Sequence, residues 1–163
     1  MTIEKMGFGE NKRLVETDYD YSLIVLGEPQ ALKRHRTFKR GTFVGNYDPS
    51  KADKKDFVVA IQHNAPEIPI DKPLMLAVNF YFGRPNSHYR TGRYAGELKP
   101  SAPLRHVKRP DIDNLLKFVA DSLNDIFWRD DTLICRVEAQ KVYSEKPRTE
   151  IYIKILDTLS EFG

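Results

Sequence analysis

Residues 112–127 carry the clearest helical pattern in the chain, and this pattern limits the folds that the sequence can adopt. Their apolar side chains recur at helical spacing and fall in one stripe: Ile112, Leu116, Val119, Ala120, Leu123, Ile126 and Phe127. A helix with one apolar stripe must bury it against another layer of structure. The segment therefore predicts a helix that packs on a sheet.

Alternating apolar residues predict the strands of that sheet. The segments with this pattern are residues 74–83, 132–143 and 149–156, while the apolar run in residues 21–29 predicts a buried strand ended by Gly27 and Pro29. Because only a short turn separates the last two, they are expected to form an antiparallel hairpin. Asp48-Pro49-Ser50 is a typical helix start and predicts a second helix in KADKKDFVVAIQHN.

The predicted order is strand, helix, strand, arm, helix, strand, strand. This order indicates an α/β (α+β) fold, in which a mixed sheet packs with two main helices in a single small domain. A chain of 163 residues is expected to form one domain. Residues 1–20 have few apolar side chains and are expected to be a flexible N-terminal extension, with the domain in 21–163.

Positive charge is concentrated in two segments, although the net charge is only +3. Residues 33–40 hold five Lys and Arg without an acid, and residues 84–109 hold seven with one acid, Glu97. Charge alone leaves two readings open, solvated loops or contacts to phosphates. On the second reading the DNA-binding residues are Lys33, Arg34, Arg36, Lys39, Arg40, Arg90, Arg93, Arg105, Lys108 and Arg109.

Residues 84–109 show no period and contain several Pro and Gly residues. A loop of this length is usually functional or disordered, so we expect a basic flexible arm that orders on binding. Tyr89 and Tyr94 in the arm, and Phe38 in the first basic segment, are candidates to stack on an opened base. For each one alone, a packing or surface role is the more common assignment.

Two carboxylates, Asp111 and Asp113, follow Pro110 at the start of the predicted helix. Asp111 is a suitable N-cap and Asp113 suits the helix dipole, so both have a purely structural explanation. Clustered carboxylates are also the ligands that Mg²⁺ prefers, and Lys117 follows one turn later to stabilise phosphate charge. A cap and a metal site do not exclude each other, so both readings remain open.

The adjacent acids Asp130 and Asp131 are the further candidate ligands, because neighbouring carboxylates repel each other without a cation or turn. A helix over 112–127 is about 24 Å long, so Asp131 cannot meet Asp111 by local folding alone. Either the following strand runs back along the helix, or the helix ends early. The sequence leaves these alternatives open.

Other classes of site are disfavoured. Cys135 is the only cysteine, lies in a predicted strand and is expected to be a small core residue. The four histidines are scattered and show no zinc spacing. No apolar run approaches the length of a membrane span, and the N-terminus lacks the apolar segment of a signal peptide, so a cytoplasmic protein is expected.

The stretch RPDIDNLLKFVADSLND followed by FWRDD resembles the signature of the RusA family of Holliday junction resolvases, and LGEPQALKRHR is similar to the family's opening strand and basic loop. The resemblance is good over about 109–156 and holds only in outline over 21–85. It implies a homodimeric endonuclease that acts on four-way DNA junctions with Mg²⁺, or with Mn²⁺ as a substitute. The family often occurs in phages and prophages, which places the protein in a bacterial host's cytoplasm.

Carried over by position, the resemblance implies that Asp111, Asp113 and Asp131 are metal ligands, with Asp130 as the alternative to Asp131, and that Lys117 is the essential lysine. Paired nicks by metal-activated water are the expected reaction. The long arm and the N-terminal extension depart from the family pattern. A flap or other branched-DNA nuclease and a non-catalytic DNA-binding protein are therefore the alternatives.

Overall fold

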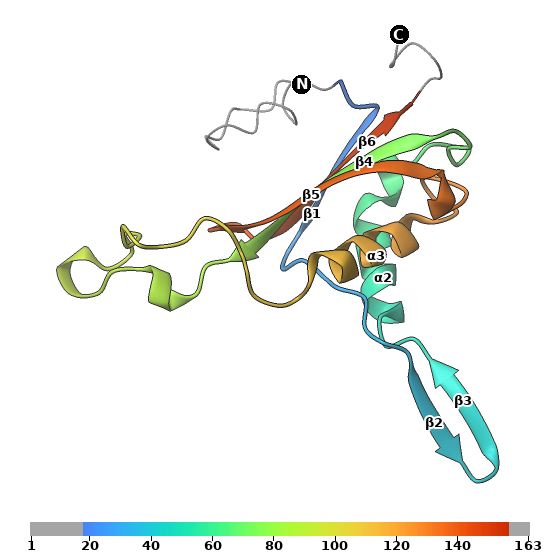
Figure 1. Ribbon diagram of the computed structural model, residues 1–163, viewed down its shortest axis with the longest axis horizontal. Coiled ribbons are helices and arrows are strands. Elements are labelled where there is room, and N and C mark those ends of the chain that lie inside the picture. The colour runs from blue at the N-terminus through green and yellow to red at the C-terminus, as the bar shows by residue number, and fades with distance from the viewer. Residues whose placement is uncertain (1–17, 157–163) are drawn as a thin grey trace.

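The computed structural model describes residues 18–156 and contains a four-stranded mixed sheet with two helices on one face (Figure 1). The sheet has the order β1-β6-β4-β5. Its elements are β1 (Tyr21–Leu26), β4 (Leu74–Gly83), β5 (Ile134–Ser144) and β6 (Arg148–Ile155), with helices α2 (Lys51–Ile61) and α3 (Ile112–Leu123). The predicted α+β class is confirmed. The predicted N-terminal extension lies outside the described residues, apart from 18–20.

Strand β4 is the central strand of the sheet. Its first nine residues are all buried, as expected for a nearly continuous apolar run covered on both faces. It pairs antiparallel with β6 on one side and parallel with β5 on the other. The predicted hairpin of the last two strands is therefore wrong, because β4 lies between them. The connection from β5 to β6 crosses the end of β4 at Gly83. It passes so close that a Cβ atom added to Gly83 would lie 3.3 Å from Pro147 Cγ in this connection.

The core lies between β4 and the two helices. Phe118 of α3 is fully buried and meets Phe57 of α2 edge to face, with 5.4 Å between ring centroids. Helix α3 ends at Leu123 instead of 127, and Asp125 then takes a positive φ of 63°. The turn lets Phe127 and Trp128 enter the core, and Trp128 Nε1 donates a hydrogen bond of 2.9 Å to Asn124 Oδ1.

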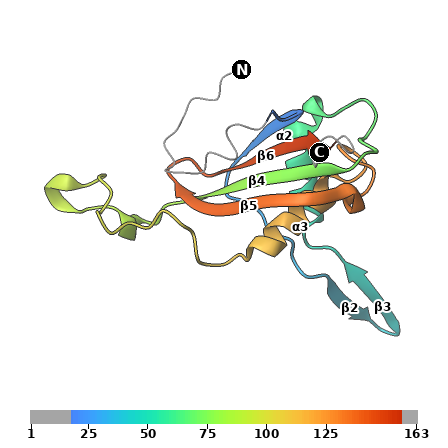
Figure 2. The same cartoon turned by 45° about the horizontal axis from the view of Figure 1, so that its top comes forward.

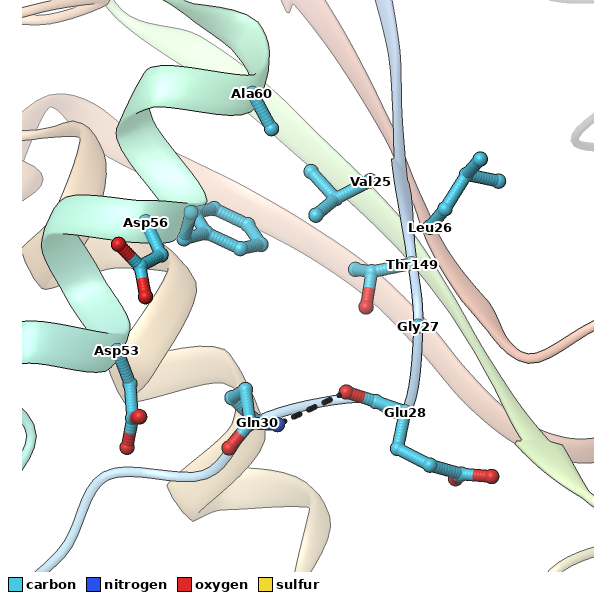
Figure 3. A pocket seen from close by; sticks show the side chains of 10 residues that line it. Val25, Leu26, Gly27, Glu28, Gln30, Asp53, Asp56, Ala60 and Thr149 are labelled. Atoms are coloured by element: carbon cyan, nitrogen blue, oxygen red, sulfur yellow. Dashed lines mark hydrogen bonds between the residues drawn. The ribbon is translucent and has the colours of Figure 1, made fainter.

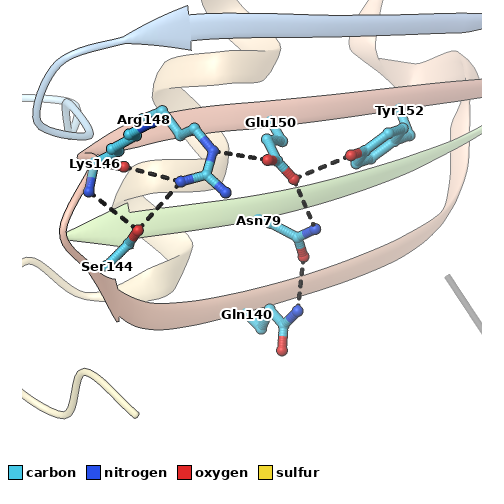
Figure 4. Close-up of polar contacts among 7 residues, drawn as sticks. All are labelled: Asn79, Gln140, Ser144, Lys146, Arg148, Glu150 and Tyr152. Atoms are coloured by element: carbon cyan, nitrogen blue, oxygen red, sulfur yellow. Dashed lines mark hydrogen bonds and ion pairs between the residues drawn. The ribbon is translucent and has the colours of Figure 1, made fainter. Parts of the chain in front are cut away.

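The opposite face of the sheet is covered by its own long side chains (Figure 4). The Arg148 guanidinium lies 3.7 Å from the Tyr81 ring centroid, and its Nε donates to Glu150 Oε1 at 2.8 Å. The Tyr152 hydroxyl donates to the other oxygen of Glu150. Burial, followed by the nearby Glu150 carboxylate, raises the pKa of Tyr81 to about 12. The helices and the predicted site residues they carry thus lie on the other face.

A separate hairpin, β2 (Arg36–Arg40) and β3 (Phe43–Tyr47), projects from the body of the protein (Figure 1). We call it the basic hairpin. The sequence predicts only a basic loop and a turn here. The strands are joined through Gly41 at φ 64°, and Phe38 packs against the rings of Phe43 and Tyr47 at 6.1 and 6.4 Å. Contacts among three aromatic rings thus support strands whose other positions are mostly exposed.

Cys135 is exposed, so its assignment to the core is wrong. The register of β5 against β4 shifts between Leu74 and Met75, and Cys135 is the extra residue at this irregularity. A bulge of this kind leaves one residue unpaired and changes where its side chain points. The alternating pattern of the sequence does not reveal such a shift.

Lys54 of α2 connects the start of its own helix to α3. Its Nζ lies 2.8 Å from Asp48 Oδ2 and 3.3 Å from Asp121 Oδ2. The hydrogen bond from Lys54, followed by that from the Ser50 amide, lowers the pKa of Asp48. A carboxylate with a lowered folded-state pKa contributes stability above its unfolded-state pKa, which is lost as the pH falls through the folded-state value.

We therefore expect Asp48→Asn to have a lower free energy of unfolding than the wild type at pH 7. Acidification below about pH 4 should then lower the free energy of unfolding of the variant less than that of the wild type. Urea unfolding at pH 7 and at pH 3 measures both quantities. Glu67→Gln, which removes an exposed carboxylate, is the control for the loss of one negative charge. Equal acid sensitivity of wild type and Asp48→Asn would show that this ion pair is not a source of the pH dependence.

Candidate active site and nucleic-acid interface

Asp111 and Asp113 lie at the start of α3, as predicted. Asp111 occupies the N-cap position in an extended conformation, but its side chain makes no capping hydrogen bond to the helix. Asp113 Oδ2 lies 3.5 Å from Lys117 Nζ, and both side chains are more than 60% exposed. A surface pair of this kind contributes a few tenths of a kcal/mol. The structural role of the two acids is thus small, and their carboxylates face solvent.

Neighbouring segments fix the start of α3. Lys141 of β5 donates from Nζ to the carbonyl oxygens of Lys108 and Pro110, both at 2.6 Å. On another side, the Leu32 amide donates to the Asn114 carbonyl at 3.0 Å. The first turn of the helix is therefore held by β5 and by the chain that leads into the basic hairpin.

The second pair of acids follows the helix. Asp130 Oδ1 accepts a 2.8 Å hydrogen bond from the Thr132 amide, and this bond is the largest cause of the lowered pKa of Asp130. Partial burial, followed by the nearby Asp130 and Asp121 carboxylates, raises the pKa of Asp131. The negative charge of Asp131 is thus less well stabilised by its surroundings than that of Asp130. Because Asp130 is engaged in a turn, Asp131 is the better candidate ligand.

The structure places these acids at opposite ends of α3. Strand β5 does run back along the helix, since Lys141 contacts the residues before Asp111, but Asp131 precedes β5 and stays at the far end. Among residues 18–156, no three His, Cys, Asp or Glu side chains come together in a group that could hold a metal ion. We call Asp111 and Asp113 the N-terminal acids. We call Asp121, Asp130 and Asp131 the C-terminal acids.

Sequence reasoning did not identify Lys54 as part of this region. It lies 67 residues from Asp121, and no local pattern signals that the two side chains meet. By pairing with Asp121, Lys54 offsets one negative charge among the C-terminal acids.

The basic side chains predicted to contact DNA are exposed, except that Arg90 is partly buried. Several are already engaged within the protein. Lys33 pairs with Asp53 at 2.6 Å, while the Arg90 and Arg93 guanidinium groups lie 3.9 and 4.9 Å from the Tyr94 ring centroid. The Tyr94 ring therefore already contacts two cations, although its side chain is 39% exposed, and Phe38 in the basic hairpin is 44% exposed. Their contacts to DNA remain predictions.

The basic arm, residues 84–109, leaves the end of β4 and returns toward the start of α3 (Figure 1). Its tip turns back on itself, with the Lys99 amide donating to the His88 carbonyl at 2.9 Å. At its root, the His106 ring stacks on Phe82 at 3.9 Å. Its predicted flexibility remains a prediction. Figures 1 and 2 both show the start of α3 between the arm and the basic hairpin.

A hollow between β1 and α2 contains none of the predicted site residues (Figure 3). Asp53 and Asp56 line it from the helix, and Glu28 lines it from the end of β1. These carboxylates disfavour a phosphate group, so the hollow is not a candidate DNA site.

The chain is similar to proteins of one nuclease family. The sequence profile of the family described as endodeoxyribonuclease RusA matches residues 27–154. The chain belongs to the RusA endodeoxyribonuclease family. A crossover junction endodeoxyribonuclease rusA of Lactococcus phage r1t is 31% identical over 110 residues, which cover 66% of this chain and 75% of the phage protein. The uncharacterized protein YqaN of Bacillus subtilis (strain 168) is 36% identical over 133 residues, which cover 80% of this chain and 92% of YqaN.

The RusA match includes both acid groups, the basic hairpin and the basic arm, and it confirms the predicted family and nuclease activity. RusA-family nucleases depend on divalent metal ions. The exposed carboxylates of Asp111 and Asp113 are of the type that binds such an ion, whereas Asp130 and Asp131 lie beyond the other end of α3. None of the helices in residues 18–156 is long and apolar enough to cross a membrane.

Proposed function

We propose that this RusA-family endonuclease resolves four-way DNA junctions by paired, symmetric nicks. The observation that carries this proposal is the position of the exposed N-terminal acids between two basic projections. The carboxylates by themselves repel DNA phosphates. The basic hairpin and the basic arm would attract the phosphates and hold them beside the carboxylates. The name of the phage relative, a crossover junction endodeoxyribonuclease, supports the choice of substrate.

The proposed cofactor is Mg²⁺, with Mn²⁺ as a substitute. When bound, the ion would supply an activated water and offset the charge on the phosphodiester. Asp111, Asp113 and Asp131 are the proposed ligands, with Asp130 as the alternative to Asp131. Lys117, exposed one turn beyond Asp113, is proposed to stabilise negative charge on the phosphate.

The proposed assembly is a homodimer. Resolution of a junction requires that two strands are cut, and a two-fold dimer has two equivalent sites, one for each strand. The cytoplasm of a bacterial host is the proposed location. Shape and backbone contacts, rather than base sequence, would then direct the enzyme to the branch point.

Cleavage of synthetic DNA tests the function. Wild type and Asp113→Asn are incubated with a four-way junction, a flap and a linear duplex, each with Mg²⁺ or with a chelator. We expect paired nicks in the junction only with wild type and Mg²⁺. Equal cutting of the flap would favour a broader branched-DNA nuclease. Cleavage by Asp113→Asn at the wild-type rate would refute the proposed ligand set.

The basic hairpin is expected to contribute to binding through charge. Neutralising Arg36, Lys39 and Arg40 with glutamine should weaken junction binding and reduce the slope of log K against log salt by up to about 0.9 for each lost phosphate contact. Binding of the Asp113→Asn protein, titrated at several salt concentrations, measures the slope without cleavage. The control neutralises Lys51 and Lys55, exposed on α2. A slope that changes only in the control would assign binding to another surface.

A further inference from the structure

We infer that Lys141 is a positioning residue for the cleavage reaction, because it fixes the main chain directly before the N-terminal acids. This inference rests on the proposed function of these acids. Lys141 lies on β5, 31 residues along the chain from Pro110. Its side chain would act on the reaction only through the placement of Asp111 and Asp113.

The Lys141 ammonium bonds to the two carbonyl groups that lead into α3. Its Nζ donates to the carbonyl oxygens of Lys108 and Pro110, both at 2.6 Å. These carbonyls stand on either side of Arg109, and the second belongs to the residue before Asp111. Hydrogen bonds from a charged donor are shorter and stronger than those between neutral groups. One side chain thus fixes the path of residues 108–110.

The main chain around Lys141 holds the same segment farther back. The His106 amide donates to the Lys141 carbonyl at 3.1 Å, and the Tyr143 amide donates to the Leu104 carbonyl at 2.9 Å. The returning limb of the basic arm therefore pairs with the outer edge of β5 as a short antiparallel segment. Beyond His106, the Lys141 side chain continues this attachment as far as Pro110. Lys141 thus joins the root of the arm to the N-terminal acids.

The sheet sets the direction of the Lys141 side chain. Lys141 pairs with Phe80 of β4, which is buried in the core beneath the helices. Directly paired residues of neighbouring strands place their side chains on the same face, so Lys141 points to the face that carries α3. Its side chain is partly buried. A rigid strand therefore supports the ammonium, as a precisely placed reaction site requires.

Other contacts hold the body of α3, so loss of the Lys141 ammonium would loosen only the start of the helix. Phe118 and Val119 are buried in the core, and the Leu32 amide donates to the Asn114 carbonyl. Asp111, by contrast, makes no capping hydrogen bond through its side chain. A misplacement of about 1 Å at a reaction site can cost about a hundredfold in rate. Removal of this ammonium should therefore slow cleavage in a protein that still folds.

Cleavage by three variants tests this role. Lys141→Met keeps an unbranched side chain but cannot donate, whereas Lys141→Arg keeps the charge and the donors. Lys146→Met, in the exposed turn between β5 and β6, is the control for the loss of one positive charge. In single-turnover cleavage of a labelled junction at saturating enzyme and Mg²⁺, we expect a loss of about a hundredfold for Lys141→Met and of less than about tenfold for Lys141→Arg. Lys146→Met should cleave at the wild-type rate.

Junction affinity separates positioning from direct DNA binding. Measured with Ca²⁺ in place of Mg²⁺, the affinity of Lys141→Met should stay within about twofold of the wild-type value. Cleavage by Lys141→Met at the wild-type rate would overturn the inference. A loss of affinity with an unchanged rate at saturating enzyme would overturn it too, because Lys141 would then be a DNA contact.

Hydrogen exchange tests the same contact without DNA, metal or activity. The Leu115 amide donates to the Asp111 carbonyl at 3.2 Å in the first turn of α3, and Phe118 lies about one turn later. In Lys141→Met, the Leu115 amide should exchange at least about tenfold faster than in the wild type, while exchange of the Phe118 amide stays unchanged. Unchanged exchange at Leu115 would show that Lys141 does not fix the start of the helix, and the inference would fail. Failure of the wild type to cut any branched DNA would instead refute the proposed function, whatever the exchange rates.

Discussion

Replacement of Asp131 by asparagine is expected to lower the rate of junction cleavage roughly a thousandfold, because loss of a proposed metal ligand would remove several kcal/mol of transition-state stabilisation. Asp130→Asn is expected to cost less than about tenfold, because an asparagine oxygen can still accept the hydrogen bond from the Thr132 amide. The two substitutions remove the same charge from adjacent positions. Their difference therefore separates metal ligation from a general effect of charge.

Single-turnover cleavage of a labelled junction at saturating enzyme measures this difference. Junction affinity, measured with Ca²⁺ in place of Mg²⁺, should change little in either variant, which would assign the loss to the chemical step. A larger loss for Asp130→Asn would exchange the roles of the two acids. A large loss of affinity in both variants would indicate that the RDD segment positions DNA.

Phe118→Ala is expected to lower the free energy of unfolding by about 3–5 kcal/mol, the cost of removing a large buried aromatic side chain. Phe118 is fully buried in the core between α3 and the sheet, and its ring packs on Phe57 of α2. The substitution thus leaves a cavity and removes the aromatic contact that joins the two helices. Loss of the orientation of α3 would also disturb the acids at both of its ends.

Urea unfolding followed by circular dichroism and by tryptophan fluorescence measures the loss, since Trp128 lies in the same core. Val107→Ala is the control, because Val107 is 88% exposed in the basic arm and its truncation should change stability by less than about 0.5 kcal/mol. A loss below about 1 kcal/mol for Phe118→Ala would mean that the core closes around the missing ring.

The sequence predicted those parts of the fold that depend on local periodicity. Strand β4 begins and ends at the predicted residues, and α2 begins directly after Ser50. The neighbours of each strand were not predictable in this way. The last two strands alternate like a hairpin, yet the more apolar β4 lies between them, because it is the strand best suited to burial on both faces.

The candidate site was predictable as a set of residues but not as an arrangement. The spacing of Asp111, Asp113 and Lys117 follows from helical geometry, and the structure reproduces it. The position of Asp131 depends on where α3 ends and on how Phe127 and Trp128 enter the core. Both features depend on tertiary packing, and the periodicity of the sequence does not predict them. The relation between the two acid groups therefore required the structure.

The pairing of β1 with β6 has a consequence for the synthesis of the protein. Within residues 18–156, β1 has β6 as its only partner in the sheet, and Tyr21 pairs with Ile153, far along the chain. At about 5–20 residues per second, a ribosome exposes β1 on the order of ten seconds before β6 is made. The sheet thus cannot close before β6 has been made. A nascent chain would pass this interval with an apolar strand edge open to chaperones and to other chains.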